Sequence, residues 1–308
     1  MKWLLVYIFC CLNVQAALFN KIDNSKLLGH LKLLASDEFA GRAPQTNGSL
    51  LSQQYIISQL TEIGISPLNN NFQQKFFYRH ISETKQGTNI IGTHLGRPNK
   101  SGNWIILSAH YDHKGKGKFG IYNGADDNAS GTSALLSIAA SIKERDVPAN
   151  FVFLFTDAEE QGLKGSKAFV ESNPALIKET LININIDMVA GTINTNKLFM
   201  LAKGLNKVLS QQEIDALYRV DDLMGQRVYT RFRNTLTGEN TAIKWLKASD
   251  HSSFNKKKIP VLFFCNGIHK NYHTTNDTFE NINPSFFLKN TNIILEHILY
   301  LAKVFNKT

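Results

Sequence analysis

Apolar runs that alternate with helical patterns constrain the fold of this 308-residue chain more than any other feature. Four runs have the length and composition of buried strands, at residues 104–108, 151–155, 181–186 and 261–265. Helices are predicted at residues 25–35, 51–63, 130–145, 163–172 and 284–305. Strands that alternate with helices indicate an α/β fold with a mostly parallel central sheet flanked by helices. The length is within the range of one large α/β domain.

Polar clusters follow these runs at the points where strands should end, and one of them opens a helix. They are His110-Tyr111-Asp112, Asp126-Asp127-Asn128, Glu159-Glu160, Asp187 and His273. In parallel sheets, ligand sites form beyond the carboxyl ends of the strands, so we expect the clusters to meet there. Two imidazoles and at least three carboxylates are the ligands needed to hold two divalent metals around a shared carboxylate. The pattern therefore predicts a binuclear metallohydrolase.

Each cluster taken alone has an ordinary explanation. A lone His-X-Asp pair such as His110 and Asp112 more often lies on the protein surface. A loop histidine such as His273 more often makes hydrogen bonds to its neighbours than it binds a metal. Helix capping explains one polar residue of the 126–128 cluster, but it does not explain three in succession. Asp187 ends an apolar strand, where an acid is costly to bury unless it is paired or bound to a metal. The occurrence of all five in sequence favours a metal site.

The chemistry of hydrolysis suggests how the carboxylates divide their work. The side chains of adjacent residues often point in different directions. One member of the Glu159-Glu160 pair can therefore bind a metal while the other faces a water molecule as general base. A carboxylate of the 126–128 cluster is expected to bridge the metals. A metal-bound His110 needs a partner for its second ring nitrogen, and Asp112 is well placed for that role. The cluster at residues 249–254 (SDHSSF) is a candidate for supporting the site.

The first sixteen residues have the features of a secretory signal peptide. Lys2 supplies a positive start, residues 3–12 form a short apolar stretch, and residues 14–16 resemble a cleavage site, with cleavage after Ala16 or Ala17. The stretch is too short to span a bilayer, although an uncleaved anchor is the alternative. We therefore expect an exported protein, periplasmic or extracellular, with residues 17–308 as one domain and no stable membrane insertion after cleavage.

Cysteine and charge limit the remaining possibilities. Removal of the signal segment leaves Cys265 alone, in an apolar strand, where a buried and inert thiol is expected. The formal net charge of +9 falls by one, to +8, with the loss of Lys2. The lysine clusters at 114–118 and 256–258 are not interleaved with aromatic residues, so no nucleic-acid partner is expected.

Residues 191–248 are less regular than the rest and lie between two motif segments. They are expected to form an insertion or flap near the site, where substrate selectivity would arise. Its aromatic side chains are candidates for pocket walls and equally for core positions: Tyr218, Tyr229, Phe232 and Trp245.

The motifs HYD, GADDNASG, DAEEQG, NIDMV, SDHSSF and YHTTNDT, in this order, resemble the zinc-dependent aminopeptidase family that includes secreted bacterial leucyl aminopeptidases and aminopeptidase Y. Residues 34–42 also resemble that family's amino-terminal region, and the likeness covers about residues 30–305. More distant relatives include glutamate carboxypeptidase II and glutaminyl cyclase. The resemblance implies a phosphorylase/hydrolase-like zinc exopeptidase fold with two Zn²⁺ per chain. Unlike some relatives, this chain lacks extra disulfides.

The resemblance also implies a role for each matching residue. Asp127 is the expected bridging ligand. His110 and Asp187 would complete one zinc site, whereas Glu160 and His273 would complete the other. The expected catalytic residues are Glu159 as general base, Asp112, which orients His110, and Tyr272, which would stabilise the oxyanion. Asp126 is then a neighbour of the site, and the role of Asp250 stays open.

The implied activity is hydrolysis of amino-terminal residues from peptides by a zinc-activated water. A glutaminyl cyclase is one alternative, although that enzyme uses a single zinc and this chain has the full ligand set. A receptor-like binding domain is another, but it should have lost ligands or the base. A glutamate-releasing carboxypeptidase also stays open, because the metal motif does not define which peptide end is held.

Overall fold

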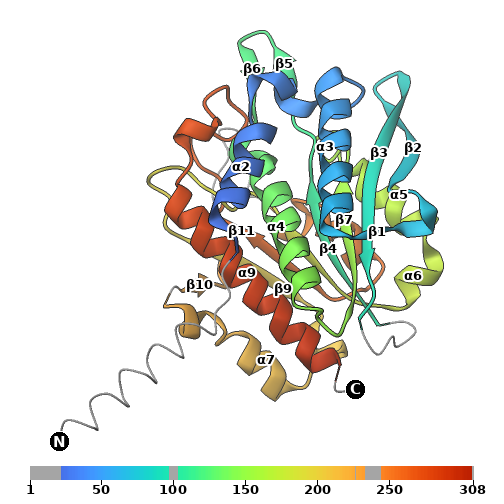
Figure 1. Cartoon of the computed structure of the whole chain (residues 1–308), viewed down its shortest axis with the longest axis vertical. Coiled ribbons are helices and arrows are strands. Elements are labelled where there is room, and N and C mark those ends of the chain that lie inside the picture. Colours follow the sequence, from blue (N-terminus) through green and yellow to red (C-terminus); the bar gives the residue numbers. More distant parts are fainter. Residues whose placement is uncertain (1–21, 97–102, 226, 233–243, 307–308) are drawn as a thin grey trace, which may run out of the picture.

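The computed structural model describes residues 22–96, 103–225, 227–232 and 244–306, and Figure 1 shows their arrangement. Within these residues nine strands form one sheet in the order β1-β3-β7-β4-β8-β11-β9-β10, with β2 paired to β3. The strands are β1 (Ser66–Pro67), β2 (Gln73–His80), β3 (Glu83–His94), β4 (Trp104–His110), β7 (Asn150–Thr156), β8 (Thr180–Ile186), β9 (Leu198–Lys203), β10 (Val228–Tyr229) and β11 (Val261–Cys265). A separate hairpin pairs β5 (Gly115–Gly117) with β6 (Gly120–Tyr122).

The helices cover both faces of the sheet. They are α2 (Asn24–Leu34), α3 (Asn47–Ile63), α4 (Gly131–Glu144), α5 (Lys164–Ser172), α6 (Pro174–Lys178), α7 (Gln211–Leu217), α8 (His251–Lys256) and α9 (Pro284–Phe305). Each predicted helix is present within a few residues of its expected bounds, and so are the four predicted strands. Gly64 ends α3 in the left-handed conformation (φ 78°), where glycine avoids a steric penalty.

Four parallel strands form the centre of the sheet: β7, β4, β8 and β11. This confirms the predicted α/β class with its parallel central sheet. The antiparallel neighbours β3 and β9, on the two sides of this centre, were not expected. The first half of β3 is polar, and β9 alternates buried with partly exposed residues, so neither shows a long apolar run.

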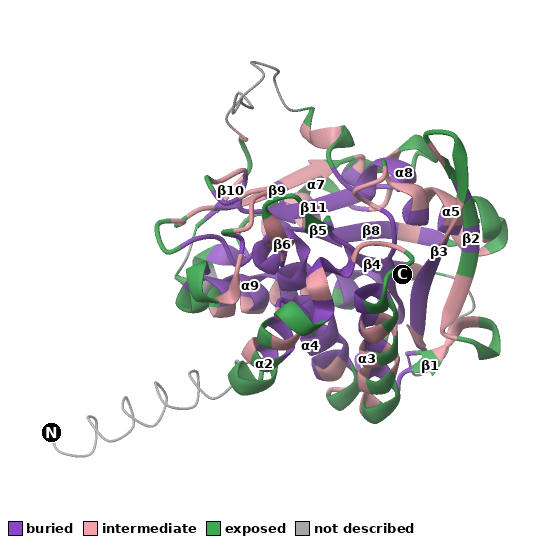
Figure 2. Ribbon diagram, turned by 90° about the horizontal axis from the view of Figure 1, so that it is seen from above, coloured by how far each residue is buried: buried purple, intermediate pink, exposed green. Residues whose placement is uncertain are grey.

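Strand β7 shows why the centre is buried on both faces. Phe151, Phe153 and Phe155 join the large core cluster under α2, α3, α4 and α9, whereas Val152 and Leu154 join the cluster under α5 and α8. Successive side chains of a strand point to opposite faces, so a continuous apolar run serves both layers. Figure 2 shows the buried strands between these two groups of helices.

The segment expected to be an insertion or flap supplies β9, β10 and α7, while its residues 226 and 233–243 lie outside the described part. Strand β9 pairs with β11 and so belongs to the main sheet. Helix α7 lies beside α9, where Tyr300 donates a hydrogen bond to the Glu213 carbonyl (2.9 Å). The predicted signal segment lies outside the described residues, and none of the described helices is long and apolar enough to cross a membrane.

Candidate metal centre

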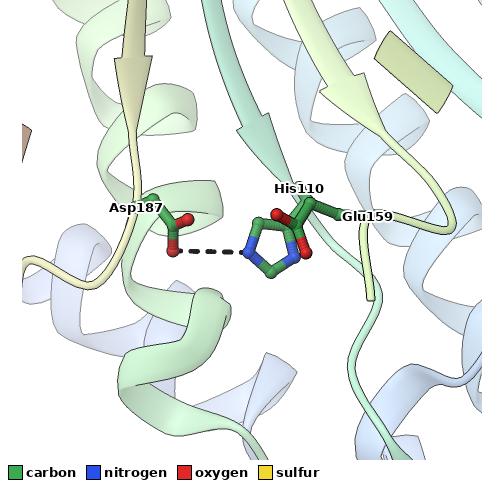
Figure 3. A group of neighbouring side chains, drawn as sticks. All are labelled: His110, Glu159 and Asp187. Atoms are coloured by element: carbon green, nitrogen blue, oxygen red, sulfur yellow. Dashed lines mark hydrogen bonds and ion pairs between the residues drawn. The ribbon is translucent and has the colours of Figure 1, made fainter. Parts of the chain in front are cut away.

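The parallel strands bring the predicted site residues to one edge of the sheet. His110 is the last residue of β4, Asp187 directly follows β8, and Glu159 and Glu160 lie in the turn after β7. His273 lies in the loop between β11 and α9. Figure 3 shows His110, Glu159 and Asp187 converging from three of these segments. The carboxyl ends of the strands thus form the site, as the sequence predicts.

Asp127 lies between two groups of side chains. Its Oδ1 is 3.4 Å from Nε2 of His110, and that same nitrogen is 3.3 Å from Oδ1 of Asp187. Its Oδ2 is 3.1 Å from Nε2 of His273, which is 3.2 Å from Oε1 of Glu160. The two oxygens of one carboxylate therefore face two different pairs of an imidazole and an acid.

The donor atoms of these groups fit divalent metal ions. Ligand atoms of His110, Glu159 and Asp187 lie within 4.8 Å of one another, as do those of His113, Asp127 and Glu160. Oε1 of Glu160 is buried and has no hydrogen-bond partner among the described residues. Nitrogen and carboxylate oxygen donors of this kind suit zinc, and cobalt or manganese can also bind them.

Asp127 belongs to a turn of irregular helix, η3 (Ala125–Ser130), that precedes α4, and its peptide bond to Asn128 is cis. The backbone N–H groups of Asp126 and Asp127 donate to the two carboxylate oxygens of Asp277, at 2.9 and 3.0 Å. Asp277 is buried, and it fixes the backbone that presents the central carboxylate. It lies within the YHTTNDT motif, where the sequence alone gives no sign of this role.

Asp126 points away from the two groups. Its Oδ1 accepts from the N–H groups of Ala190 and Gly191, and its Oδ2 accepts from Asn266 and His269. It therefore ties the loops after β8 and β11 to the segment that carries Asp127. These hydrogen bonds give Asp126 a structural role, so the first acid of the Asp126-Asp127 pair is not needed as a metal ligand.

Asp112 connects two of the motifs. Its Oδ1 accepts a hydrogen bond from the Glu159 N–H (3.0 Å), and its Oδ2 accepts one from the Glu160 N–H (3.3 Å). Its Oδ1 is also 3.7 Å from Nδ1 of His110, while its backbone carbonyl is 3.1 Å from that nitrogen. Asp112 thus contacts the imidazole and also holds the turn that presents both glutamates.

Burial and neighbouring charges shift the pKa values of Glu159 and Glu160 in opposite directions. Burial, with the negative charges of Asp250 and Asp187 nearby, raises the pKa of Glu159 well above its usual value. Burial would raise the pKa of Glu160 as well, but the imidazoles of His113 and His273 outweigh it and hold that pKa well below its usual range. Glu159 is therefore the member better suited to accept a proton near neutral pH, and Glu160 is the better permanent anion.

A cavity of about 260 Å³ opens beside these residues. Its apolar lining includes Met188, Trp245, Phe263 and Ile268, and Tyr272 lines it beside His273. Of the aromatic side chains named as possible pocket walls, Trp245 lines this cavity. Tyr218, Tyr229 and Phe232 do not belong to its lining, and Phe232 instead packs on Phe199 and Trp245, with ring centroids 5.0 and 4.5 Å apart.

The SDHSSF cluster, at the start of α8, supports the ends of two strands. Asp250 is fully buried and accepts a hydrogen bond from Thr156, the last residue of β7. Ser249 accepts a hydrogen bond from Asn185 of β8 (2.8 Å). The cluster therefore fixes the two strands that lead to Glu159 and Asp187.

Arg42 connects the amino-terminal segment to the site. It is completely buried and donates to four backbone carbonyls: Tyr111, Asn123 and Gly124, which flank the metal-site loops, and Leu34 of α2. In the sequence, residues 34–42 show only a likeness to the family, because an arginine that pairs with backbone carbonyl groups has no complementary charge pattern to reveal it.

Replacement of Arg42 by alanine is expected to lower the free energy of unfolding by ~3 kcal/mol or more, because four buried carbonyls lose their donor together. Urea unfolding measures this difference. Arg42→Lys should recover only part of it, because an ammonium group cannot match the guanidinium fork. The control is Arg79→Ala on the exposed side of β2, and an unchanged unfolding midpoint in R42A would contradict the assigned role.

A known protein family covers the segment of the chain that holds these residues. The model of peptidase family M28 matches residues 89–298, which span every cluster of the site. The chain belongs to peptidase family M28. This confirms the family that the motifs resemble. Aminopeptidase YwaD of Bacillus subtilis is 29% identical over 206 residues, which are 63% of this chain and 40% of that protein.

Solved structures share the fold of this M28 chain. LapB from Legionella pneumophila superposes with a TM-score of 0.69 at 18% identity, covering 94% of this chain and 74% of that one. A Fimbriiglobus ruber glutaminyl cyclase superposes with a TM-score of 0.72 at 16% identity, covering 91% and 95%. This chain spans less than half the length of three curated relatives that it matches, namely 40%, 47% and 44% of their lengths.

Proposed function

We propose that this M28 chain is an exported aminopeptidase that holds two zinc ions and removes amino-terminal residues from peptides. The observation that carries the proposal is the carboxylate of Asp127, whose two oxygens face two separate ligand groups. The first metal position comprises His110, Asp127 and Asp187. The second comprises Asp127, Glu160 and His273. The names of relatives such as aminopeptidase YwaD support the same activity.

Glu159 supplies the proton transfer in the proposed reaction. Zinc, when bound, lowers the pKa of a water molecule and polarises the scissile carbonyl. Glu159 accepts the proton of the attacking water and returns it to the leaving amine, for which its raised pKa is suitable. Asp112 keeps the Glu159 backbone in place through the N–H group of that residue.

Tyr272 is proposed to donate a hydrogen bond to the oxyanion of the tetrahedral intermediate. Burial, with the carboxylates of Asp127 and Glu160 nearby, raises the pKa of Tyr272 far above its usual value. The hydroxyl group therefore keeps its proton at any physiological pH. Its ring stacks on the imidazole of His273, with centroids 3.7 Å apart, and its position in the cavity lining supports contact with a substrate.

The apolar cavity wall supports a preference for uncharged amino-terminal side chains. Trp245 and Phe263 offer aromatic surface, and Met188 and Ile268 add flexible and branched apolar contacts. An apolar pocket with a few polar groups at one end is the usual arrangement for small ligands. Export is proposed from residues 1–16, and the amino-terminal sequence of the mature protein in its native host tests it.

Removal of the metal is expected to abolish hydrolysis of leucyl- and other aminoacyl-nitroanilides, and added zinc is expected to restore it. Cobalt or manganese should restore part of the activity, because all the proposed ligands are nitrogen or oxygen donors. The measurements are nitroaniline release before and after dialysis against a chelator, and the metal content of the fully active protein. Fewer than two metal ions in fully active enzyme would exclude the binuclear site.

The same preparation separates the alternatives. A glutaminyl cyclase would convert glutaminyl peptides to pyroglutamyl peptides, which mass spectrometry detects as a loss of ammonia. A carboxypeptidase would release the last residue of a peptide whose amino terminus is acetylated. Inactivity on all three substrate types, with metal bound, would favour a binding domain.

A further inference from the structure

We infer that His113 is a fourth protein ligand of the second metal position and completes its coordination. The inference rests on the proposed function, since it takes the two metal positions as given. His113 follows directly after the HYD motif, yet neither the motif nor the proposed mechanism assigns it a role.

The surroundings of His113 are those of a ligand. Its side chain is completely buried, and its Nδ1 lies 2.8 Å from Oε1 of Glu160 and 3.8 Å from Oδ2 of Asp127. Despite this proximity, neither ring nitrogen of His113 nor Oε1 of Glu160 has a partner with hydrogen-bond geometry among the described residues. Buried polar atoms normally have such partners, so these atoms are explained better by a shared ion than by bonding to each other.

The distances support four donors around one centre. Nε2 of His273 is 3.1 Å from the same Asp127 oxygen and 3.2 Å from the same Glu160 oxygen that face His113. In a tetrahedral zinc site with bonds of about 2.0–2.2 Å, neighbouring donor atoms lie about 3.3–3.6 Å apart. The observed separations of 2.8–3.8 Å extend to both sides of that value, so a zinc ion fits with small adjustments.

Gly124 lets the imidazole of His113 pack directly on the backbone. A β-carbon at this position would lie 2.5 Å from Cγ and Cδ2 of His113, so only glycine lets the ring pack here. Gly124 also has a positive φ of 60°. Arg42 donates to its carbonyl, so the chain beneath the ring is held in place. An imidazole held in this way is prepared to bind metal without further ordering.

The two metal positions then differ in kind. The second has four protein donors, the number that closes a zinc site, whereas the first has three, the number that leaves a coordination position open. Glu159 groups with His110 and Asp187, so the general base faces the open position. The structure therefore assigns tight retention of metal to the second position and the exchangeable, reactive role to the first.

The competing explanation is that His113 only holds Glu160 by a hydrogen bond. Glutamine can donate such a bond but is not a usual zinc ligand, whereas cysteine is a strong zinc ligand. The variants His113→Gln and His113→Cys therefore separate the two roles. His30→Gln is the matched control, since His30 is a buried histidine of α2 that bonds to Tyr55.

The experiment titrates zinc against a competing chelator and records the spectrum of the cobalt form. Wild-type protein and H30Q are expected to bind two zinc ions, one of which resists the chelator. H113Q is expected to remain folded by circular dichroism and to lose its tight zinc, with affinity reduced by more than the ~10–100-fold that loss of an outer partner causes. Cobalt-loaded H113C should gain a thiolate-to-cobalt charge-transfer band that the wild type, which already has Cys265 in the cavity, lacks.

Two outcomes would overturn the inference. If H113Q keeps one tight zinc and cobalt-loaded H113C has the wild-type spectrum, His113 is not a ligand, while the proposed binuclear function stands. If the wild type itself binds fewer than two zinc ions, both the binuclear site and the role of His113 are wrong.

Discussion

Replacement of Glu159 by glutamine is expected to lower kcat by on the order of 10²–10⁴-fold while both metal ions stay bound. The amide keeps the size of the side chain but cannot accept the proton of the attacking water. The proposed ligands of both metal positions are unchanged in this variant, because Glu160 stays beside His273 and Glu159 is proposed as the base and not as a ligand. Steady-state hydrolysis of an aminoacyl-nitroanilide and the zinc content of the purified variant are the two measurements.

Glu160→Gln is the matched comparison, because Glu160 is the adjacent glutamate of the Glu159-Glu160 pair. Its side chain should lose much of its affinity for metal, since the carboxylate beside His273 is replaced by a neutral amide. The two variants should therefore differ in zinc content at limiting zinc, although both lose activity. An E159Q protein with substantial residual turnover would show that another group is the base.

Replacement of Asp127 by asparagine is expected to have the largest effect on metal content, because one carboxylate faces both ligand groups. The variant should bind at most one zinc under conditions that saturate two in the wild type, and its hydrolysis should fall to the background rate. Two metals held close together need a shared anion between them, which an amide does not provide. Metal analysis after gel filtration measures the stoichiometry.

The neighbouring acid provides the contrast for this experiment. Asp126→Asn should still bind two zinc ions at saturation, but it should be less stable by ~1–3 kcal/mol, because Asn266 and His269 both direct donors at the oxygen that becomes an amide nitrogen. Urea unfolding of the metal-free protein measures this effect. If D126N loses metal as readily as D127N, the distinction between the two acids is wrong.

The local features of the fold could be read from the sequence. The run of phenylalanine and valine in β7 has to be buried on both faces, and the periodic apolar residues of α9 follow Pro284 at a typical helix start. Strands β2, β3 and β9 escaped prediction because none of them has a long apolar run, so pairing with a neighbouring strand and not composition makes them strands. The polar first half of β3, for example, becomes a strand through its pairing with β2.

The sequence by itself determined that polar clusters end four parallel strands, and therefore which side chains meet at one edge of the sheet. Periodicity and strand direction are sufficient for that conclusion, because parallel strands end on the same side. Only the tertiary structure decided which oxygen of Asp127 faces which group, that Asp126 turns away to Asn266 and His269, and that His113 lies beside Glu160. These facts depend on loops that approach each other from distant parts of the chain, and no local pattern records the rotation of one side chain relative to another.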